Sequence, residues 1–218
     1  MVHIQKGPAP QALIQAKRLH LTCYDEMDTA TKTAIKEDLL SEQYHLCAYC
    51  MRRIHLDTMQ IEHYLAQNPE DDDYDPASTI DYHNMLGVCP GGKETGCAYK
   101  SMTCDAHRKN IKLTVDPLNQ VSISKISYLS DGTITSSDSN INHDLQNTLN
   151  LNCAEARLKE NRKSALDAVK SWVHQNYPNK TVTKAVWKSL YEKYCLSPGP
   201  QKKPYIGIIE WYLKKKSL

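Results

Sequence analysis

The stretch of sequence between residues 47 and 110 decides the fold, and it opens with CAYC at residues 47–50. Two residues between the thiols of Cys47 and Cys50 allow both sulfurs to reach one Zn²⁺ at about 2.3 Å. A tetrahedral ion needs two more ligands, and three further cysteines follow in the same stretch. We predict that Cys89, just before a Pro-Gly-Gly turn, and Cys104 complete the site. Cys97 competes with Cys104 for the fourth place.

The composition is that of an ordinary globular protein. The chain has 218 residues, of which 40% are hydrophobic and 24% charged, and this length suits one medium domain. No apolar run approaches the roughly 18 residues of a membrane span, and the first residues lack the apolar segment of a secretory leader. Eight cysteines without an export signal indicate a reducing compartment. We therefore expect a cytoplasmic protein with clustered thiols that bind metal.

Charge is distributed unevenly along the chain. The formal net charge is only +2, but residues 154–218 contain 14 Lys/Arg against 5 Asp/Glu. This asymmetry favours a surface for nucleic acid or for an acidic partner. A solvated, lysine-rich helical surface explains it equally well.

Hydrophobic periodicity predicts a mixture of helices and strands. Helices are expected over 8–21 and 25–42. Three more are expected towards the C-terminus: one after a capping pair at Asn152 and Glu155, one over 181–195 and one over 204–216. Short strands are expected over 51–57 and 59–65. Alternating β-branched residues over 112–137, divided by Asp131-Gly132, predict a β-hairpin. The acidic run at 70–75 is expected to be a solvated loop.

Chemically active side chains lie between and after the cysteines. Glu62-His63 follows the first pair, Asn84 comes next, and Asp105 and His107 follow Cys104. This order resembles the HNH endonucleases. It consists of a carboxylate and a histidine, then an asparagine, then an acid or histidine beside the last cysteine, and zinc-type thiols frame the whole. The resemblance implies a zinc-stapled ββα fold with one catalytic divalent ion, Mg²⁺ or Mn²⁺.

Phosphodiester hydrolysis gives these residue types their roles under that resemblance. His63 would be the general base for the attacking water, because histidine titrates near neutral pH. Glu62 and Asp105 would bind the catalytic ion through oxygen atoms, and Asn84 would hold the His63 ring. Two positions depart from the family: Glu62 stands where Asp is usual, and Asp105 where His or Asn is usual. The second metal ligand is therefore open between Asp105 and His107, with Asp105 preferred.

A closer resemblance covers nearly the whole chain. The segments that carry it are CAYC, QIEHYLAQNP, NMLGVC, TCDAHRKN, VDPLN, Tyr-x-x-Asp-Gly and LNLNCAEARLKENR. In these segments the chain is similar to the PtuB family, the HNH subunits of Septu-type anti-phage defence and of some retron systems. The resemblance implies a toxic nuclease that an ABC-type ATPase holds until infection, in some systems with a retron reverse transcriptase and its RNA and DNA. Its substrate would be DNA or transfer RNA. Arg108 and Lys109, beside the predicted phosphate site, are expected to bind the nucleic-acid backbone, the alternative being plain surface charge.

We therefore expect an α+β protein with three parts: an N-terminal helical segment (1–42), a zinc-stapled ββα nuclease core (43–112), and a β-hairpin followed by a C-terminal helical region (113–218). The rival interpretation is a non-catalytic zinc module that binds nucleic acid or protein. An apolar stripe in the last helix is expected to dock onto the ATPase; it comprises Tyr205, Ile208, Ile209, Tyr212 and Leu213. The alternatives are that this stripe packs in the protein's own core, or that the lysines beside it bind substrate.

Overall fold

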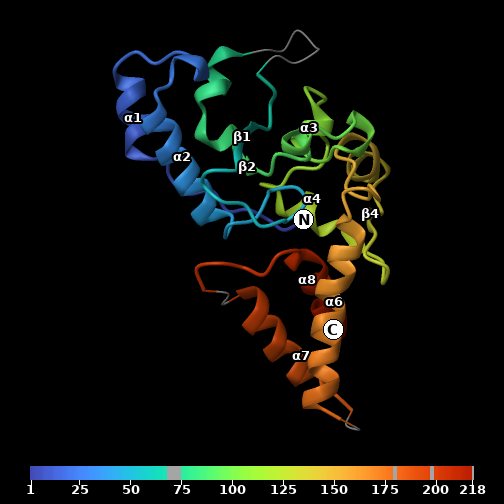
Figure 1. Cartoon of the computed structure of the whole chain (residues 1–218). Coiled ribbons are helices and arrows are strands. Elements are labelled where there is room, and N and C mark those ends of the chain that lie inside the picture. Colours follow the sequence, from blue (N-terminus) through green and yellow to red (C-terminus); the bar gives the residue numbers. More distant parts are fainter. Residues whose placement is uncertain (68–74, 179–180, 197–198, 218) are drawn as a thin grey trace.

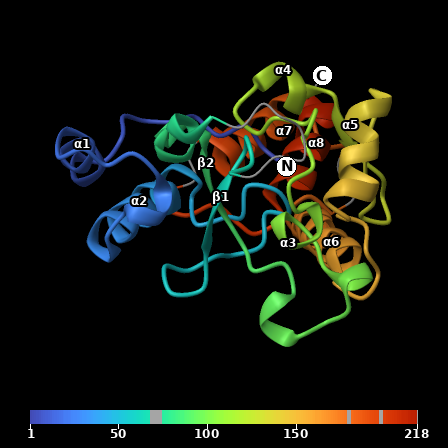
Figure 2. The same cartoon turned by 90° about the horizontal axis from the view of Figure 1, so that it is seen from above.

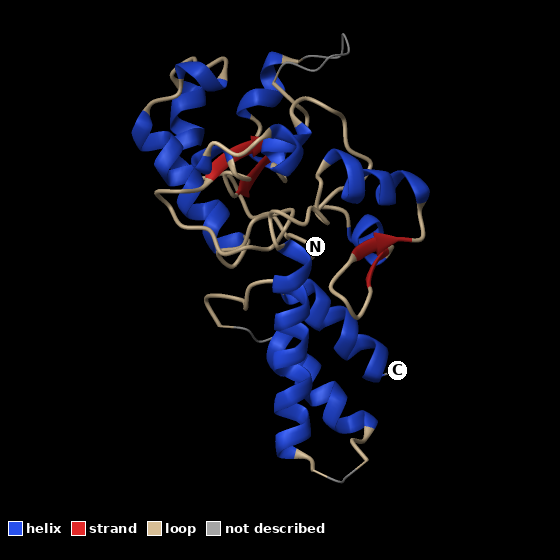
Figure 3. Cartoon of the chain, turned by 45° about the vertical axis from the view of Figure 1, so that its right-hand side comes forward, coloured by secondary structure: helices blue, strands red, loops and turns tan. Residues whose placement is uncertain are grey.

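Two N-terminal helices and a small sheet form the upper part of the molecule in Figure 1, and three C-terminal helices form the lower part. The computed structural model describes residues 1–67, 75–178, 181–196 and 199–217. In chain order the helices and strands are α1 (Gln11–Arg18), α2 (Thr29–Glu42), β1 (Gln60–His63), β2 (Met85–Val88), α3 (Asp105–Arg108), α4 (Gln120–Ser124), β3 (Ile126–Tyr128), β4 (Ile134–Ser136), α5 (Ser139–His143), α6 (Leu158–Asn176), α7 (Lys184–Tyr191) and α8 (Ile206–Ser217). The strands form two small antiparallel sheets among the helices (Figure 3). A mixed helical and stranded fold is confirmed.

The two predicted N-terminal helices are present but start later than expected. Helix α2 begins after Asp28, whose carboxylate accepts a hydrogen bond of 2.7 Å from the amide of Thr31. An aspartate that satisfies a free amide in this way is a strong helix start. Residues 24–26 form a separate short turn instead of joining α2. Buried Ile35 and Leu39 fix the inner face of α2 against the core.

The central sheet pairs β1 with β2 in antiparallel fashion, so that His63 lies opposite Met85. Gln43, just after α2, ties that helix to the sheet: its side chain accepts from the amide of Gly87 and donates to its carbonyl, both at 2.7 Å. Figure 2 shows α1 and α2 on one side of this sheet and α5 and α6 on the other. The order β1, β2, α3 therefore brings two strands and a short helix together in the part of the chain that carries the cysteines.

The predicted strand over 59–65 is present as β1, but the strand expected over 51–57 is wrong. Only an isolated bridge between Leu46 and Arg53 occurs there. The chain bends around the cysteine pair, and Met51 has φ 61°, which breaks an extended conformation. The predicted β-hairpin is present as β3 and β4, but extended structure over residues 120–124 is wrong: these residues form α4, which the Asn119 side chain caps. Residues 70–74 of the acidic run lie outside the described residues.

The capping pair predicted for the helix after residue 152 is also wrong. Helix α6 begins at Leu158, after Arg157 in the left-handed conformation. The Asn152 side chain instead accepts hydrogen bonds from the amide of Ile134, at 3.0 Å, and from the Arg162 guanidinium, at 2.7 Å. Its oxygen therefore joins the hairpin to α6 and is not used to start the helix.

The apolar stripe of α8 lies inside the protein. Ile208, Ile209 and Leu213 are buried, and α8 packs against both α6 and α7. The expectation that this stripe docks onto a partner is wrong, because its own core already covers it. Among the described residues, none of the helices is both long enough and apolar enough to cross a membrane.

Candidate active site and metal centre

Four buried cysteines from three separate segments meet at one point. The Sγ atoms of Cys47, Cys50, Cys89 and Cys104 all lie within 4.8 Å of one another. Three of the Sγ–Sγ distances are 3.7, 3.8 and 3.9 Å. Four sulfurs at about 2.3 Å from one tetrahedral ion would be about 3.8 Å apart, whereas a disulfide needs about 2.05 Å. This cluster can therefore hold a metal ion such as zinc.

Local backbone geometry builds both arms of the cluster. In the first, the Met51 amide donates to the Cys47 carbonyl at 3.0 Å and closes a tight turn around the pair. In the second, Gly91 has φ 65°, and a Cβ there would lie 2.2 Å from the Thr103 carbonyl oxygen. Only glycine allows this close approach. The Thr103 amide donates to the Gly91 carbonyl at 2.9 Å, which holds the segment before Cys104 against the segment after Cys89.

Electrostatics in the cluster favour a bound cation. Contact with Cys47 and the other two thiols, followed by burial, raises the pKa of Cys104 well above its usual range. A metal ion offsets this cost because it binds the thiolate form. Cys97 is not a member of the cluster: it is half-buried in the insertion between Cys89 and Cys104.

Two carboxyl groups meet beside the cluster, one from β1 and one from α3. Burial, and then the neighbouring Asp105 carboxylate, raises the pKa of Glu62 well above its usual range, although Arg108 and Tyr49 oppose this shift. The Tyr49 hydroxyl donates to Glu62 at 3.0 Å. Two carboxylates held this close repel unless a proton or a cation lies with them, and a divalent cation prefers such oxygen ligands. The donor set therefore fits a hard divalent ion.

His63 lies next to this pair at the end of β1 and is buried. Its Nε2 is 2.9 Å from the carbonyl oxygen of Thr79. Because a carbonyl only accepts, Nε2 carries the hydrogen, and a neutral ring keeps its lone pair on Nδ1. Burial lowers the pKa of His63, against opposing contributions from the Thr79 hydrogen bond and from Asp105. The ring is therefore neutral near pH 7, the state that a general base requires.

Asn84 does not hold the His63 ring, contrary to expectation. Its amide donates to the carbonyls of Leu65 and Ser78, both at 3.0 Å, and its oxygen accepts from the Leu65 amide at 2.6 Å. A buried amide uses its hydrogen-bonding groups on whichever backbone it meets, and here that is the chain on either side. Asn84 thus fixes the segment that presents Thr79, and the Thr79 carbonyl contacts the ring.

Arg108 is not available to nucleic acid, so its predicted phosphate contact is wrong. The side chain is 1% exposed and pairs with the Glu62 carboxylate. Its other donors go to the carbonyls of Ile111, His63 and Tyr64, at 2.8, 3.3 and 2.5 Å, and to the Tyr49 hydroxyl. A buried guanidinium needs such internal acceptors, and at 1% exposure this side chain has no surface on which to meet a phosphate.

The remaining predicted residues, His107 and Lys109, have partners other than Glu62. The Nδ1 atom of His107 is 3.0 Å from the carbonyl oxygen of Thr148, and its ring stacks on Tyr99 with a centroid distance of 4.5 Å. Asp105, and not His107, is the residue that contacts Glu62. Lys109 is exposed, and its ammonium lies 4.5 Å from the Tyr99 ring centroid.

Three residues of this site were missed in the sequence. Tyr49 lies inside CAYC and could have been noticed only as the spacer of a metal-binding pair. Thr79 acts through its backbone carbonyl, for which no side-chain pattern exists. Lys93, whose ammonium is 3.4 Å from Asp105, was visible only as one positive charge in a Gly/Lys-rich insertion.

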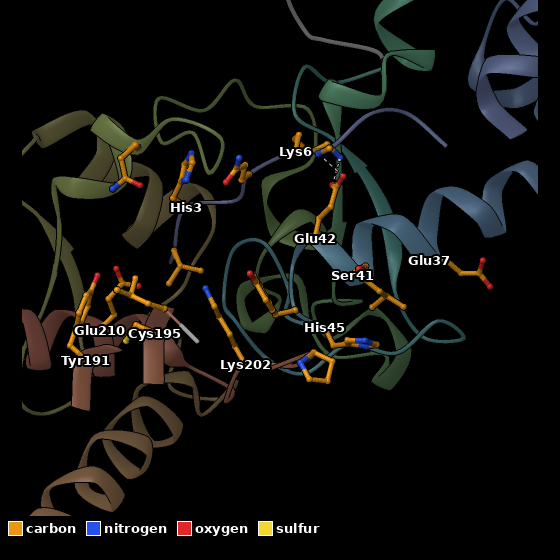
Figure 4. A pocket seen from close by; sticks show the side chains of 18 of the residues that line it. His3, Lys6, Glu37, Ser41, Glu42, His45, Tyr191, Cys195, Lys202 and Glu210 are labelled. Carbon is orange, nitrogen blue, oxygen red and sulfur yellow. Dashed lines mark hydrogen bonds and ion pairs between the residues drawn. The ribbon is translucent and has the colours of Figure 1, made fainter. Parts of the chain in front are cut away.

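A wide cavity of about 1090 Å³ lies elsewhere, between the N-terminal segment with α2 and the C-terminal helices α7 and α8 (Figure 4). Its lining mixes acids, lysines and histidines, and the figure shows the Lys6–Glu42 ion pair at its edge. Glu62, His63 and Asp105 do not line it. The candidate chemistry therefore lies outside this cavity.

No protein-family model and no curated protein match this chain. The chemistry of the site therefore carries the functional argument.

Proposed function

We propose that this protein is a metal-dependent nuclease of the HNH type that hydrolyses phosphodiester bonds in DNA or transfer RNA. The observation that carries the proposal is the meeting of Glu62 and Asp105 beside His63. Metal-assisted hydrolysis of a phosphodiester needs a general base next to oxygen atoms that bind the metal ion. The four-cysteine cluster supports it, because Cys104 directly precedes Asp105 and Cys89 directly follows β2, the strand paired with the one that carries Glu62 and His63. We assign that cluster to a structural Zn²⁺.

The reaction follows from the tautomer of His63. Nδ1 takes a proton from water as the water oxygen forms a bond to phosphorus. The bond between phosphorus and the leaving oxygen breaks, and that oxygen takes a proton from solvent. A divalent ion held by Glu62 and Asp105 would supply positive charge at the phosphate and at the leaving oxygen. Thr79 keeps the His63 ring in the required orientation through its carbonyl.

The biological setting is proposed from the sequence resemblance alone. The likeness to the Septu-type HNH subunits runs through nearly the whole chain, and it supports a toxic effector under the control of an ABC-type ATPase, in a retron setting together with a reverse transcriptase. Co-purification of the tagged full chain with such an ATPase tests this part. Sequencing the nucleic acids of cells that make the triggered complex would identify the substrate.

A cleavage assay tests the chemistry. Plasmid DNA and transfer RNA are incubated with the full-length protein or its complex, with Mg²⁺, with Mn²⁺ and with a chelator. We expect cleavage that the chelator and His63→Ala abolish. His83→Ala is the matched control, because His83 is exposed and its ring contacts Asp81 and Tyr82, away from the proposed site. A non-catalytic zinc module would bind nucleic acid without cleaving it, and equal cleavage by wild type and His63→Ala would exclude His63 as the base.

A further inference from the structure

One exposed cation touches a candidate catalytic carboxylate. The ammonium of Lys93 lies 3.4 Å from Oδ2 of Asp105, and the Lys93 side chain is 49% exposed. Asp105 in turn contacts Glu62. Lys93 therefore contacts solvent and one of the two proposed metal ligands at the same time.

The backbone around Lys93 is anchored on both sides. The Lys93 amide donates to the carbonyl of Pro90 at 3.1 Å. The turn that starts here is bounded by Gly92, with φ 102°, and Gly96, with φ 63°. Pro90 directly follows Cys89, a member of the cysteine cluster. The backbone of Lys93 is therefore held next to that cluster, while its long side chain remains free to change partner.

The other cations near the site are already used. The guanidinium of Arg108 is buried and paired with Glu62. The ammonium of Lys109 lies over the Tyr99 ring. Within the described residues, Lys93 is thus the exposed cation with a direct contact to Glu62 or Asp105.

We propose that Lys93 is a catalytic residue that binds a non-bridging oxygen of the scissile phosphate. This rests on the proposed function, because the phosphate must lie against the ion bound by Glu62 and Asp105. A phosphate in that position is within reach of a lysine that contacts Asp105. When substrate and metal bind, the ammonium exchanges the Asp105 carboxylate for the phosphate, where it neutralises charge that grows as the bond to the leaving oxygen breaks.

Because of this exchange, Lys93→Gln should strengthen metal binding and slow catalysis. The ammonium competes with a metal ion for Asp105, so its removal should tighten Mn²⁺ binding; breaking an exposed ion pair of this kind corresponds to about a 2- to 5-fold change in affinity. Loss of a cation on the reacting phosphate should lower kcat, on the order of 10-fold or more. Removing a lysine that merely pairs with Asp105 would also tighten metal binding but would leave kcat unchanged, so the fall in kcat distinguishes the two roles.

The test uses the full-length, zinc-loaded protein. Mn²⁺ binding is measured by titration calorimetry without nucleic acid, and kcat and KM are measured on the cleaved substrate. Lys100→Gln is the matched control, because Lys100 is exposed in the same insertion between the two cysteines. Lys93→Arg, which keeps the charge, should recover most of the rate.

Tighter Mn²⁺ binding together with a lower kcat in Lys93→Gln, and no change in Lys100→Gln, is the expected result. Suppose that the wild-type protein binds Mn²⁺ and that Asp105→Asn weakens this binding. Unchanged Mn²⁺ affinity or unchanged kcat in Lys93→Gln would then overturn the role of Lys93 but not the proposed function. Wild-type protein that binds no Mn²⁺, or binds it equally well after Asp105→Asn, would overturn the proposed function and the role of Lys93 with it.

Discussion

Arg108, from α3, donates a buried hydrogen bond to the Glu62 carboxylate on β1. The two residues are 46 positions apart in the chain, and their contact joins the helix to the sheet that carries His63. The same guanidinium also contacts the carbonyls of His63 and Tyr64. Arg108 is therefore a structural connection at the centre of the proposed site, although the sequence suggested a surface contact to phosphate.

Replacing Arg108 should destabilise the protein strongly. In Arg108→Met the Glu62 carboxyl group and the carbonyls of His63 and Tyr64 lose their buried donor, and removing one partner of a buried pair costs about 3–5 kcal/mol. Denaturant unfolding measures the change. Lys109→Ala, at the exposed neighbouring residue, should change the free energy of unfolding by less than about 0.5 kcal/mol. Arg108→Met protein of normal stability but weak nucleic-acid binding would instead support the phosphate contact.

Loss of one clustered cysteine should remove the metal and the fold together. Cys104→Ser is expected to give protein without stoichiometric zinc and with a much lower unfolding temperature, because binding to a closed site contributes directly to folding. Elemental analysis and thermal denaturation measure both quantities. Cys97→Ser should keep the zinc and most of the stability, since Cys97 lies outside the cluster. The opposite pattern would assign the fourth ligand to Cys97.

The pH profile of cleavage should report the environment of His63. Burial lowers the pKa of this ring below its usual 6.5. The neutral, active form therefore persists as the pH falls to 6.5, and the rate should decline only at lower pH, where protonation removes the lone pair on Nδ1. A plot of log kcat/KM against pH locates the midpoint. An acid limb centred above 6.5 would contradict this assignment of the base.

The His63→Ala variant provides the corresponding rate measurement. Removing a general base typically costs on the order of 10²- to 10⁴-fold in rate. We expect this loss at every pH, with normal zinc content and an unchanged unfolding curve. A loss of rate accompanied by loss of zinc would indicate a structural effect.

A second buried arginine should stabilise the C-terminal part. Arg162 is fully buried and donates to the carbonyls of Gly132 and Leu151, at 2.6 and 2.9 Å, and to the side chain of Asn152. Arg162→Ala leaves these acceptors unpaired in the interior, and we expect a loss of about 2–4 kcal/mol in the free energy of unfolding. Lys163→Ala changes the adjacent exposed residue and should have almost no effect. Equal stability of the two variants would show that the buried network contributes little.

The stripe of α8 should behave as core. Ile208 is buried, so Ile208→Ala is expected to cost about 2–5 kcal/mol. Lys215→Ala, on the exposed side of the same helix, is the control. Unfolding measurements on the isolated chain decide the matter: a stable Ile208→Ala variant that no longer binds an ATPase would restore the docking interpretation.

Local patterns in the sequence were enough to predict several features. The spacing of CAYC, the later cysteines and Glu62-His63 indicated which residue types can bind metal. The 3.6-residue period and the Asp131-Gly132 turn predicted the C-terminal helices and the hairpin, because both depend on interactions between close neighbours in the chain. The capping pair failed, since Asn152 has a stronger use in contacts with Ile134 and Arg162.

Only the tertiary structure decided which groups meet. It brought Cys104 and not Cys97 into the cysteine cluster, and it placed Asp105 at Glu62 and Lys93 at Asp105. It also turned Arg108 inward, because a carboxylate and several carbonyls from other segments satisfy its donors there. Such partners lie tens of residues away in the chain. The free-energy cost of burying a charge depends on whether the fold brings them into contact with it. Charge and residue type are written in the sequence, but whether a charge faces a phosphate or an internal carboxylate is decided by packing.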